Sequence, residues 1–186
     1  NSETVVAEVV RQPDSGFSTS TKQNAAIVGL SCRLPGKIRQ LSDLWEVMES
    51  KGCLSTKVPQ SRWDVEKLSM DALEIDPKRK SCIDSAALIE GIDMFDPTYF
   101  GISVPEARRM DPNHRLLLEN VTQALHDSGM AKDEIKGENI GLWVGMSNSD
   151  YNDVPGAGFK GSTSVYGATE AALSVAAGRV SFQLGL

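Results

Sequence analysis

The sequence lacks any apolar run that approaches the roughly 20 residues a helix needs to span a bilayer, and its mean hydropathy is −0.23. It also lacks an excess of basic residues, since 19 Lys and Arg against 25 Asp and Glu give a net charge of −6. Affinity for nucleic acid comes largely from Lys and Arg side chains that neutralise phosphates. We therefore expect neither a membrane span nor a nucleic-acid partner.

Cysteine and histidine are scarce. The cysteines Cys32, Cys53 and Cys82 are odd in number and form no Cys-x-x-Cys pair, and the histidines His114 and His126 are not spaced as metal ligands. This pattern excludes a disulfide framework and disfavours a metal site. Since no basic segment followed by an apolar run marks a signal peptide either, we expect a reduced, cytoplasmic location.

What is present is typical of a globular domain, because hydrophobic residues make up 40% and charged residues 24% of the 186 residues. Residues 1–23 are rich in Ser and Thr and lack periodicity. They predict a flexible linker or terminal tail, with at most one helical turn at the valine pairs. The first residue is Asn rather than Met, which indicates processing or a fragment. The ordered domain is expected over residues 24–186.

The first half of that domain contains one predicted strand and one predicted helix. The apolar run at residues 25–30 predicts a buried strand, followed by a turn at residues 35–36. Ser42 is a candidate N-cap for a helix that ends by Gly52. Residues 53–93 are irregular, and we expect short helices and turns there.

The second half is better specified. Ser103 begins a short helix with capping-box spacing, and Asp111 followed by proline begins a second helix that stops at residues 128–129. Residues 140–145 alternate apolar side chains with Gly and Trp, which predicts a strand. The small residues from about Ser164 predict a final buried helix that runs to Leu186.

Strand, helix, long insertion, helix, strand and helix is an order typical of an α/β fold. The two predicted strands fall short of the about five or six in an average sheet. We therefore expect an incomplete mixed sheet with packed helices.

Two motifs in the sequence are weak. Residues 156–161 match the G-x-G-x-x-G pattern but do not follow a strand directly, so we interpret them as a surface loop. Residues 145–149 resemble a nucleophile elbow but have Ser149 in place of its second glycine, and both histidines precede them. The sequence favours neither nucleotide binding nor a serine hydrolase.

The polar segments around Arg62 and Asp111 are interpreted as structural. Asp111 is predicted to cap its helix, and Arg62 or Arg115 to pair with a buried carboxylate or a backbone carbonyl. The two histidines are predicted to lie on a helix surface or to be hydrogen-bonded. Cys32 is predicted to be a small core residue that is not ionised.

With these segments placed, residues 24–186 resemble the N-terminal half of a β-ketoacyl synthase of the modular polyketide synthase type. The resemblance rests on AIVGLSCRLPG (26–36), LW (44–45), VPQSRWD (58–64), FDPTYFGIS (95–103), EA (106–107), MDPNHRLLLE (110–119), GLWVG (141–145), DY (150–151) and AAGRVSFQLGL (176–186). The motif residues that it marks as structural are Arg62, Trp63, Asp64, Asp111, Arg115 and Arg179. Small departures are a shortened loop after Gly36 and Ser-Ala-Ala at residues 85–87, where the family commonly has a Gly-Gly-Phe-type turn.

The resemblance implies the N-terminal half of a thiolase-like fold and a decarboxylating Claisen condensation. In that family a Cys thiolate takes an acyl chain from a carrier-protein thioester, and two histidines assist the condensation with a malonyl-type extender. It implies no cofactor bound to this chain, but phosphopantetheine on an acyl carrier protein. The implied partners are that carrier protein, neighbouring polyketide synthase domains and, at full length, a second copy.

The resemblance also implies that no catalytic residue lies in this sequence, because the family's nucleophilic Cys and both its catalytic His positions correspond to residues beyond Leu186. We expect the chain alone to be inactive. Two alternatives remain open. One is a non-catalytic scaffold such as a chain-length-factor-like partner, and the other is a fatty-acid-type 3-oxoacyl-carrier-protein synthase.

Overall fold

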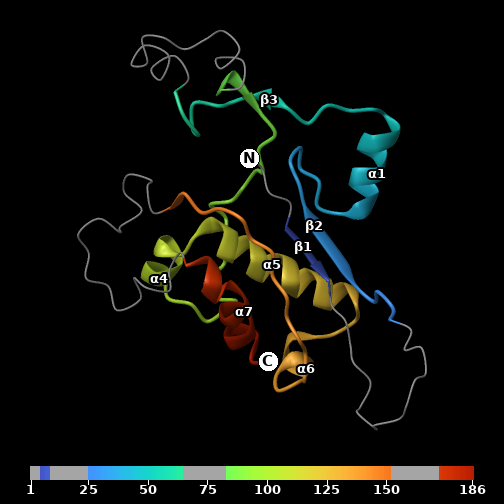
Figure 1. Cartoon of the computed structure of the whole chain (residues 1–186), viewed down its shortest axis with the longest axis vertical. Coiled ribbons are helices and arrows are strands. Elements are labelled where there is room, and N and C mark those ends of the chain that lie inside the picture. The colour runs from blue at the N-terminus through green and yellow to red at the C-terminus, as the bar shows by residue number, and fades with distance from the viewer. Residues whose placement is uncertain (1–4, 9–24, 65–82, 152–171) are drawn as a thin grey trace. The chain divides into compact units, whose positions relative to one another are not determined.

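The computed structural model describes residues 5–8, 25–64, 83–151 and 172–186 (Figure 1). The described residues belong to two compact units. One unit contains those between Cys32 and Gly91. The other contains residues 5–8, residues 25–31 and those from Ile92 onward. No helix among the described residues has the length and apolar character to cross a bilayer.

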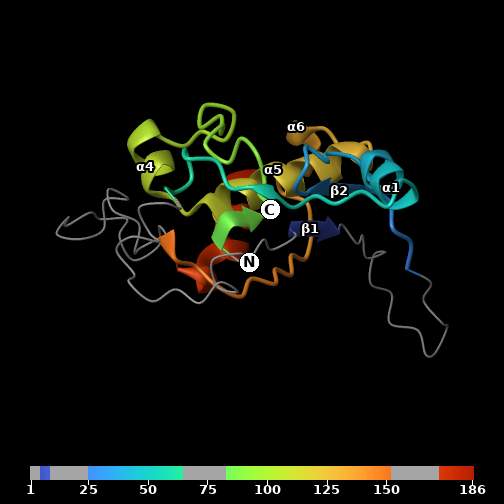
Figure 2. The same ribbon diagram turned by 90° about the horizontal axis from the view of Figure 1, so that it is seen from above.

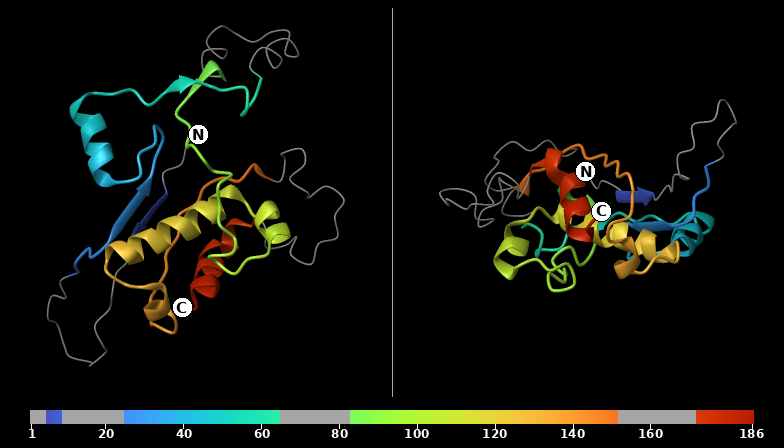
Figure 3. Two further views of the ribbon diagram at one scale, coloured as in Figure 1. Left: turned by 180° about the vertical axis from the view of Figure 1, so that it is seen from behind. Right: turned by 90° about the horizontal axis from the view of Figure 1, so that it is seen from below.

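The larger unit is built around α5 (Pro112–Asp127), which begins and ends as the sequence predicts. The helix α7 (Ala176–Leu184) packs beside it, as Figures 1 and 3 show. The shorter elements are α4 (Val104–Arg109), α6 (Lys132–Ile135) and the 3-10 turn η2 (Leu173–Val175). Their buried side chains form one core: Phe100, Ile102, Ala107, Met110, Leu117, Leu118, Val121, Ala124, Leu125, Met130, Ile135, Ala176, Val180 and Leu184.

Local capping explains where α4 and α5 begin. The Ser103 hydroxyl accepts a hydrogen bond from the Glu106 N–H at 3.3 Å, and Asp111 Oδ1 accepts one from the Asn113 N–H at 2.7 Å. Each cap satisfies a backbone donor that has no partner within its own helix. The chain leaves α5 through Gly129, whose φ of +84° lies in the left-handed region that favours glycine. These boundaries confirm the prediction.

The end of α7 differs from the prediction of a helix running to Leu186. Gly185 has a φ of +75°, and the Leu186 N–H donates to the Ser181 carbonyl at 2.9 Å. This backbone reversal ends the helix at Leu184. The Gly185 carbonyl then accepts from the Gly137 N–H at 2.7 Å. Residues 164–171, the predicted start of this helix, lie outside the described residues, as does the motif at residues 156–161.

The first strand lies later than predicted. The strand β2 covers Leu30–Arg33 and pairs with β1 (Val5–Glu8), whereas the sequence predicted a strand at residues 25–30. Asp127 Oδ2 accepts from the Leu30 N–H at 2.9 Å, and the Ser31 hydroxyl donates to the Asn120 carbonyl at 2.7 Å. These contacts with α5 fix where the strand starts.

The strand β1 falls inside the predicted linker at residues 1–23, so the suggestion of a helical turn at Val5–Val6 is wrong. Residues 1–4 and 9–24 lie outside the described residues. The boundary between a linker and a domain beginning at Asn24 therefore stays a prediction.

The predicted strand at residues 140–145 is not formed, although its alternation is present. Ile140, Leu142 and Val144 pack against the core, while Trp143 is 79% exposed. Figure 2 shows this stretch as extended chain. No backbone hydrogen bond joins residues 141–150 to another residue that the structure describes. Periodicity correctly predicted the buried face, but a strand also needs a neighbouring strand to pair with.

The smaller unit contains α1 (Leu41–Glu49) and a pair of two-residue antiparallel strands, β3 (Thr56–Lys57) and β4 (Ser85–Ala86). The N-cap of α1 is Gln40, not Ser42 as predicted, because Asp43 Oδ2 accepts from the N–H groups of residues 39 and 40. The strand pair was not predicted, since two residues are too few for a periodic signal. Residues 65–82 lie outside the described part of the chain.

At Gly29 the segment before β2 passes close to the backbone of α5. A Cβ atom there would lie 2.2 Å from the Ala124 carbonyl oxygen and 2.8 Å from the Ser128 nitrogen. Since both contacts are with backbone atoms, Gly29→Ala is expected to lower the free energy of unfolding by about 1–3 kcal/mol. The measurement is the urea midpoint of the purified chain.

The matched control is Gly178→Ala in α7. A Cβ atom there meets nothing within 4 Å, and alanine suits a helix better than glycine does. This variant is expected to raise the free energy of unfolding by about 0.5–1 kcal/mol. Equal midpoints for the two variants would contradict the packing of Gly29 against α5.

Candidate functional site

A group of buried and half-buried polar side chains lies where α4, α5 and the chain after residue 146 meet α7. We call it the polar corner, and it consists of Glu106, Asp111, His114, Ser149 and Arg179. Asp111 and His114 are each only 1% exposed. Because buried charged and polar groups need partners, their hydrogen bonds determine what the corner can do.

Arg179 joins α7 to α4. Its Nη1 lies 3.0 Å from Glu106 Oε1 and 3.4 Å from the sulfur of Met110. The two charged side chains are 9% and 21% exposed, so this ion pair is largely screened from water. Its geometry couples the position of α7 to that of the helix before α5.

Asp111 joins the start of α5 to the following chain. Its Oδ1 accepts from the Asn113 N–H, and its Oδ2 accepts from the Ser149 hydroxyl. Two residues later, the Tyr151 hydroxyl donates to the Arg108 carbonyl at 2.7 Å. The predicted capping role of Asp111 is therefore observed, and Ser149 is a partner that the sequence did not reveal.

Arg115 does not form the predicted pair with the buried carboxylate of Asp111. Within the described part of the chain no ion pair links Arg115 to Asp111, whose carboxylate is bonded to Asn113 and Ser149. The Arg115 Nε is buried without a hydrogen-bond partner among the described residues. Arg115 lies one helical turn after Asp111, but the Asp111 carboxylate is bonded to other donors.

The prediction for His114, a surface or hydrogen-bonded histidine, is wrong. His114 is neither on the helix surface nor hydrogen-bonded, because both ring nitrogens are buried and have no partner among the described residues. Burial lowers the pKa of His114, the Asp111 carboxylate opposes that shift, and Arg179 adds to it. The ring is thus held neutral. His126 is exposed in the last turn of α5, as predicted.

Ser149, Asp111 and His114 are the residue types of a hydrolytic triad, but they are not arranged as one. The Ser149 hydroxyl donates to Asp111 rather than to His114. A serine nucleophile needs an imidazole that accepts its proton and a carboxylate that orients the imidazole. In the part of the chain that the structure describes, no strand leads into residues 145–149, as a nucleophile elbow requires. The polar corner therefore holds helices together and does not activate a nucleophile.

The cysteines do not supply a nucleophile in the described structure either. Cys32 is buried, and its pKa is raised by burial and by the nearby Asp43 carboxylate. Since the thiolate is the reactive form, this environment disfavours reaction, as predicted. Cys53 is exposed in the chain between α1 and β3, and Cys82 lies outside the described residues. The described residues contain no cluster of three or more metal-ligating side chains.

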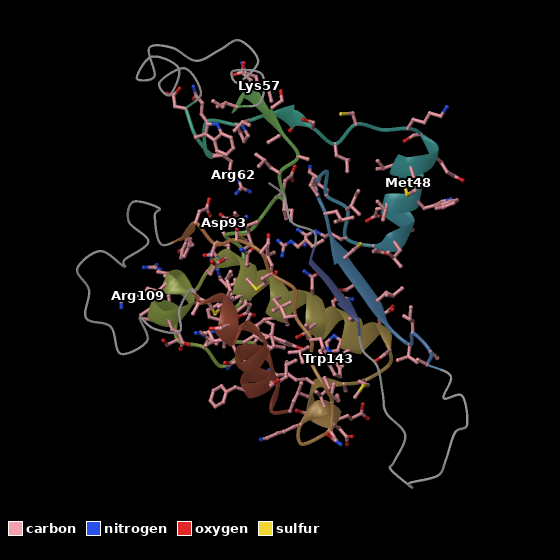
Figure 4. All side chains as sticks on the ribbon, in the orientation of Figure 1. Met48, Lys57, Arg62, Asp93, Arg109 and Trp143 are labelled. Carbon is pink, nitrogen blue, oxygen red and sulfur yellow. The ribbon has the colours of Figure 1, made fainter. Side chains whose placement is uncertain are left out.

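The motif at residues 62–64 belongs to the smaller unit. Arg62, labelled in Figure 4, donates to the Ile89 carbonyl, and Trp63 Nε1 donates to the Ile83 carbonyl at 3.3 Å. Asp64 is exposed. The predicted pairing of Arg62 with a backbone carbonyl is confirmed. Arg33 donates similarly to the Gly91 carbonyl at 2.7 Å, a contact that the sequence did not predict.

A family model for the N-terminal domain of β-ketoacyl synthase matches residues 22–186. The chain belongs to the β-ketoacyl synthase family. The curated relatives of this ketoacyl synthase chain are polyketide synthases. It is 34% identical over 165 residues to the mycocerosic acid synthase-like polyketide synthase of Mycolicibacterium smegmatis, covering 87% of this chain and 8% of that protein.

Two further relatives agree. Over 168 residues the chain is 34% identical to the lovastatin nonaketide synthase of Monascus pilosus, which covers 89% of this chain and 5% of the relative. Over 189 residues it is 32% identical to the mycoketide-CoA synthase of Mycobacterium tuberculosis, covering 98% of this chain and 4% of the relative. The chain thus spans a small part of the curated relatives it matches.

Solved structures confirm the fold that the resemblance implied. The ketosynthase from module 6 of the bacillaene synthase from Bacillus subtilis 168, as a cysteine-to-serine variant, superposes with a TM-score of 0.67 and 29% identity over 87% of this chain. A second structure of that ketosynthase gives 0.64 and 24% over 97%. This chain spans 25% of the length of the variant ketosynthase and 24% of the length of the other.

Removal of the Asp111 cap is expected to destabilise α5. Asp111→Ala deletes the acceptor of the Asn113 N–H and the partner of Ser149, and should cost about 0.5–2 kcal/mol of unfolding free energy. Asp111→Asn keeps an acceptor that caps helices well and should cost less. Urea midpoints of both variants and the parent measure this. A larger loss for Asn than for Ala would contradict the capping role.

Removal of Arg179 is expected to cost more, because Glu106 is left as a largely buried charge. Arg179→Met should lower the unfolding free energy by up to about 3–5 kcal/mol, and adding Glu106→Gln should recover part of that loss. The control is Glu90→Gln, which breaks the exposed Lys37–Glu90 pair of 3.8 Å and should change stability by less than about 1 kcal/mol. Additive losses for Arg179 and Glu106 would show that the two side chains are not coupled.

Proposed function

We propose that the whole protein containing this chain is a polyketide synthase ketosynthase that catalyses decarboxylative Claisen condensation. The observation that carries the proposal is the family match over residues 22–186, with polyketide synthases as curated relatives. The scaffold and fatty-acid-type alternatives have no observation that favours them over this one.

The proposed reaction has two bond-forming steps. A cysteine thiolate attacks the carbonyl of an acyl thioester, forming a new thioester while the carrier thiol leaves. A malonyl-type thioester then loses carbon dioxide, and the resulting carbanion attacks the acyl carbonyl, so that a carbon–carbon bond forms and the cysteine thiolate leaves. Hydrogen-bond donors directed at the developing oxyanion lower the barrier.

In this proposal the described chain contributes structure and not chemistry. Cys32 is buried with a raised pKa, which disfavours its thiolate. In the polar corner an ion pair joins α7 to α4, and a hydrogen bond joins the start of α5 to the chain at Ser149. These features support a structural role for Cys32 and for the polar corner. The proposal places the nucleophilic cysteine and both catalytic histidines beyond Leu186, as the family resemblance implies.

The proposed partners follow from the same family. They are an acyl carrier protein, neighbouring polyketide synthase domains and a second ketosynthase copy. Phosphopantetheine on the carrier protein presents the acyl and extender groups, and no cofactor binds this chain itself. Cytoplasmic location belongs to the proposal as well.

The test compares this chain with the whole protein, both incubated with an acyl thioester and examined by mass spectrometry. The chain alone should carry no stoichiometric acyl group on Cys32, Cys53 or Cys82, because the activated cysteine lies elsewhere. The whole protein should be acylated once, and adding a malonyl thioester should release carbon dioxide and lengthen the acyl chain.

Cys32→Ala in the whole protein is the control, and it should leave acylation intact. Loss of acylation in this folded variant would assign the nucleophile to this chain and overturn the proposal. A whole protein that takes up no acyl group would favour the non-catalytic scaffold instead.

A further inference from the structure

The two histidines of this chain lie on the same helix in opposite environments. His114 is 1% exposed near the start of α5, and His126 is exposed in the last turn. A buried histidine whose ring nitrogens both lack partners among the described residues is unusual, because buried polar groups are generally hydrogen-bonded. Its surroundings therefore determine what happens when it takes up a proton.

We propose that the polar corner is a pH-sensitive contact, which holds α7 against α4 while His114 is neutral and releases α7 when His114 is protonated. The proposal concerns the described helices alone and does not depend on the proposed condensation. It rests on the placement of His114 among charges contributed by separate elements.

The groups that act on His114 come from every element of the corner. Asp111 on the same helix attracts a proton to the ring, while Arg179 on α7 repels it. Glu106 on α4 is bonded to Arg179, and Ser149 on the extended chain is bonded to Asp111. The neutral ring leaves both of these contacts undisturbed.

Protonation changes the balance of contacts. An imidazolium donates from both nitrogens and carries a full charge. It competes with Ser149 for the Asp111 carboxylate, and it places a second positive charge beside Arg179. Since Arg179 is the ion-pair link between α7 and α4, repulsion of its guanidinium weakens the attachment of α7 to α4.

The pH range follows from the direction of the shift. Burial lowers the pKa of His114 in the closed form below the ordinary value of about 6.5. The open and unfolded forms therefore bind the proton more readily, and protonation favours them. The contact is complete above about pH 6.5 and is lost progressively as the pH falls below that value, towards the lowered pKa.

The experiment measures amide hydrogen exchange of residues 180–184 in α7 between pH 7.5 and pH 5.5, corrected for intrinsic exchange. In the parent chain, opening should become more frequent at pH 5.5, by up to about tenfold, because that pH lies about one unit below the ordinary histidine pKa. His126→Gln is the matched control and should behave as the parent. His114→Gln removes the titration and should show no change with pH.

A second measurement keeps the test decisive if His114→Gln does not fold. In the His126→Gln chain, His114 gives the one imidazole signal, and its titration can be followed by NMR. Its midpoint should lie below 6.5 and coincide with the onset of α7 opening. An ordinary midpoint, or α7 exchange that is independent of pH or unchanged by His114→Gln, would overturn the proposal.

Discussion

The structure of the larger unit depends on the burial of one carboxylate. Asp111 precedes the proline that begins α5, and it is almost wholly removed from water. A buried carboxylate is stable only when donors surround it, and here they are the Asn113 N–H and the Ser149 hydroxyl. One side chain thus fixes the start of the longest helix and the course of chain nearly forty residues later.

The parts of this fold that the sequence predicts are those governed by neighbours in the chain. The caps at Ser103 and Asp111 act over two or three residues, so residue type and spacing are enough to place both helices. The link from Arg179 to Glu106 spans 73 residues, and no local pattern marks it. Tertiary contacts likewise determine that β2 begins at Leu30 rather than at residue 25, through Asp127.

The same distinction applies to the candidate site. The resemblance identified Asp111 and Arg179 as structural, but neither the resemblance nor spacing showed that Ser149 bonds to one and Glu106 to the other. His114 was predicted wrongly, because its position near the start of a helix does not show that this face of the helix is buried. In the proposed function the chemistry lies outside these contacts, and the chain spans about a quarter of the ketosynthase chains it resembles.

The chemistry of imidazole explains how the polar corner tolerates a fourth ionisable group besides Glu106, Asp111 and Arg179. A lysine in place of His114 would put a full positive charge beside Arg179, and a second carboxylate would repel Asp111. Histidine becomes neutral at a smaller energetic cost than either, because its ordinary pKa lies close to neutral pH. A neutral ring can therefore be buried while Asp111 and Arg179 each keep their own partner, Ser149 for one and Glu106 for the other. The same property makes the arrangement depend on pH, since the ring regains its charge when the pH falls below its lowered pKa.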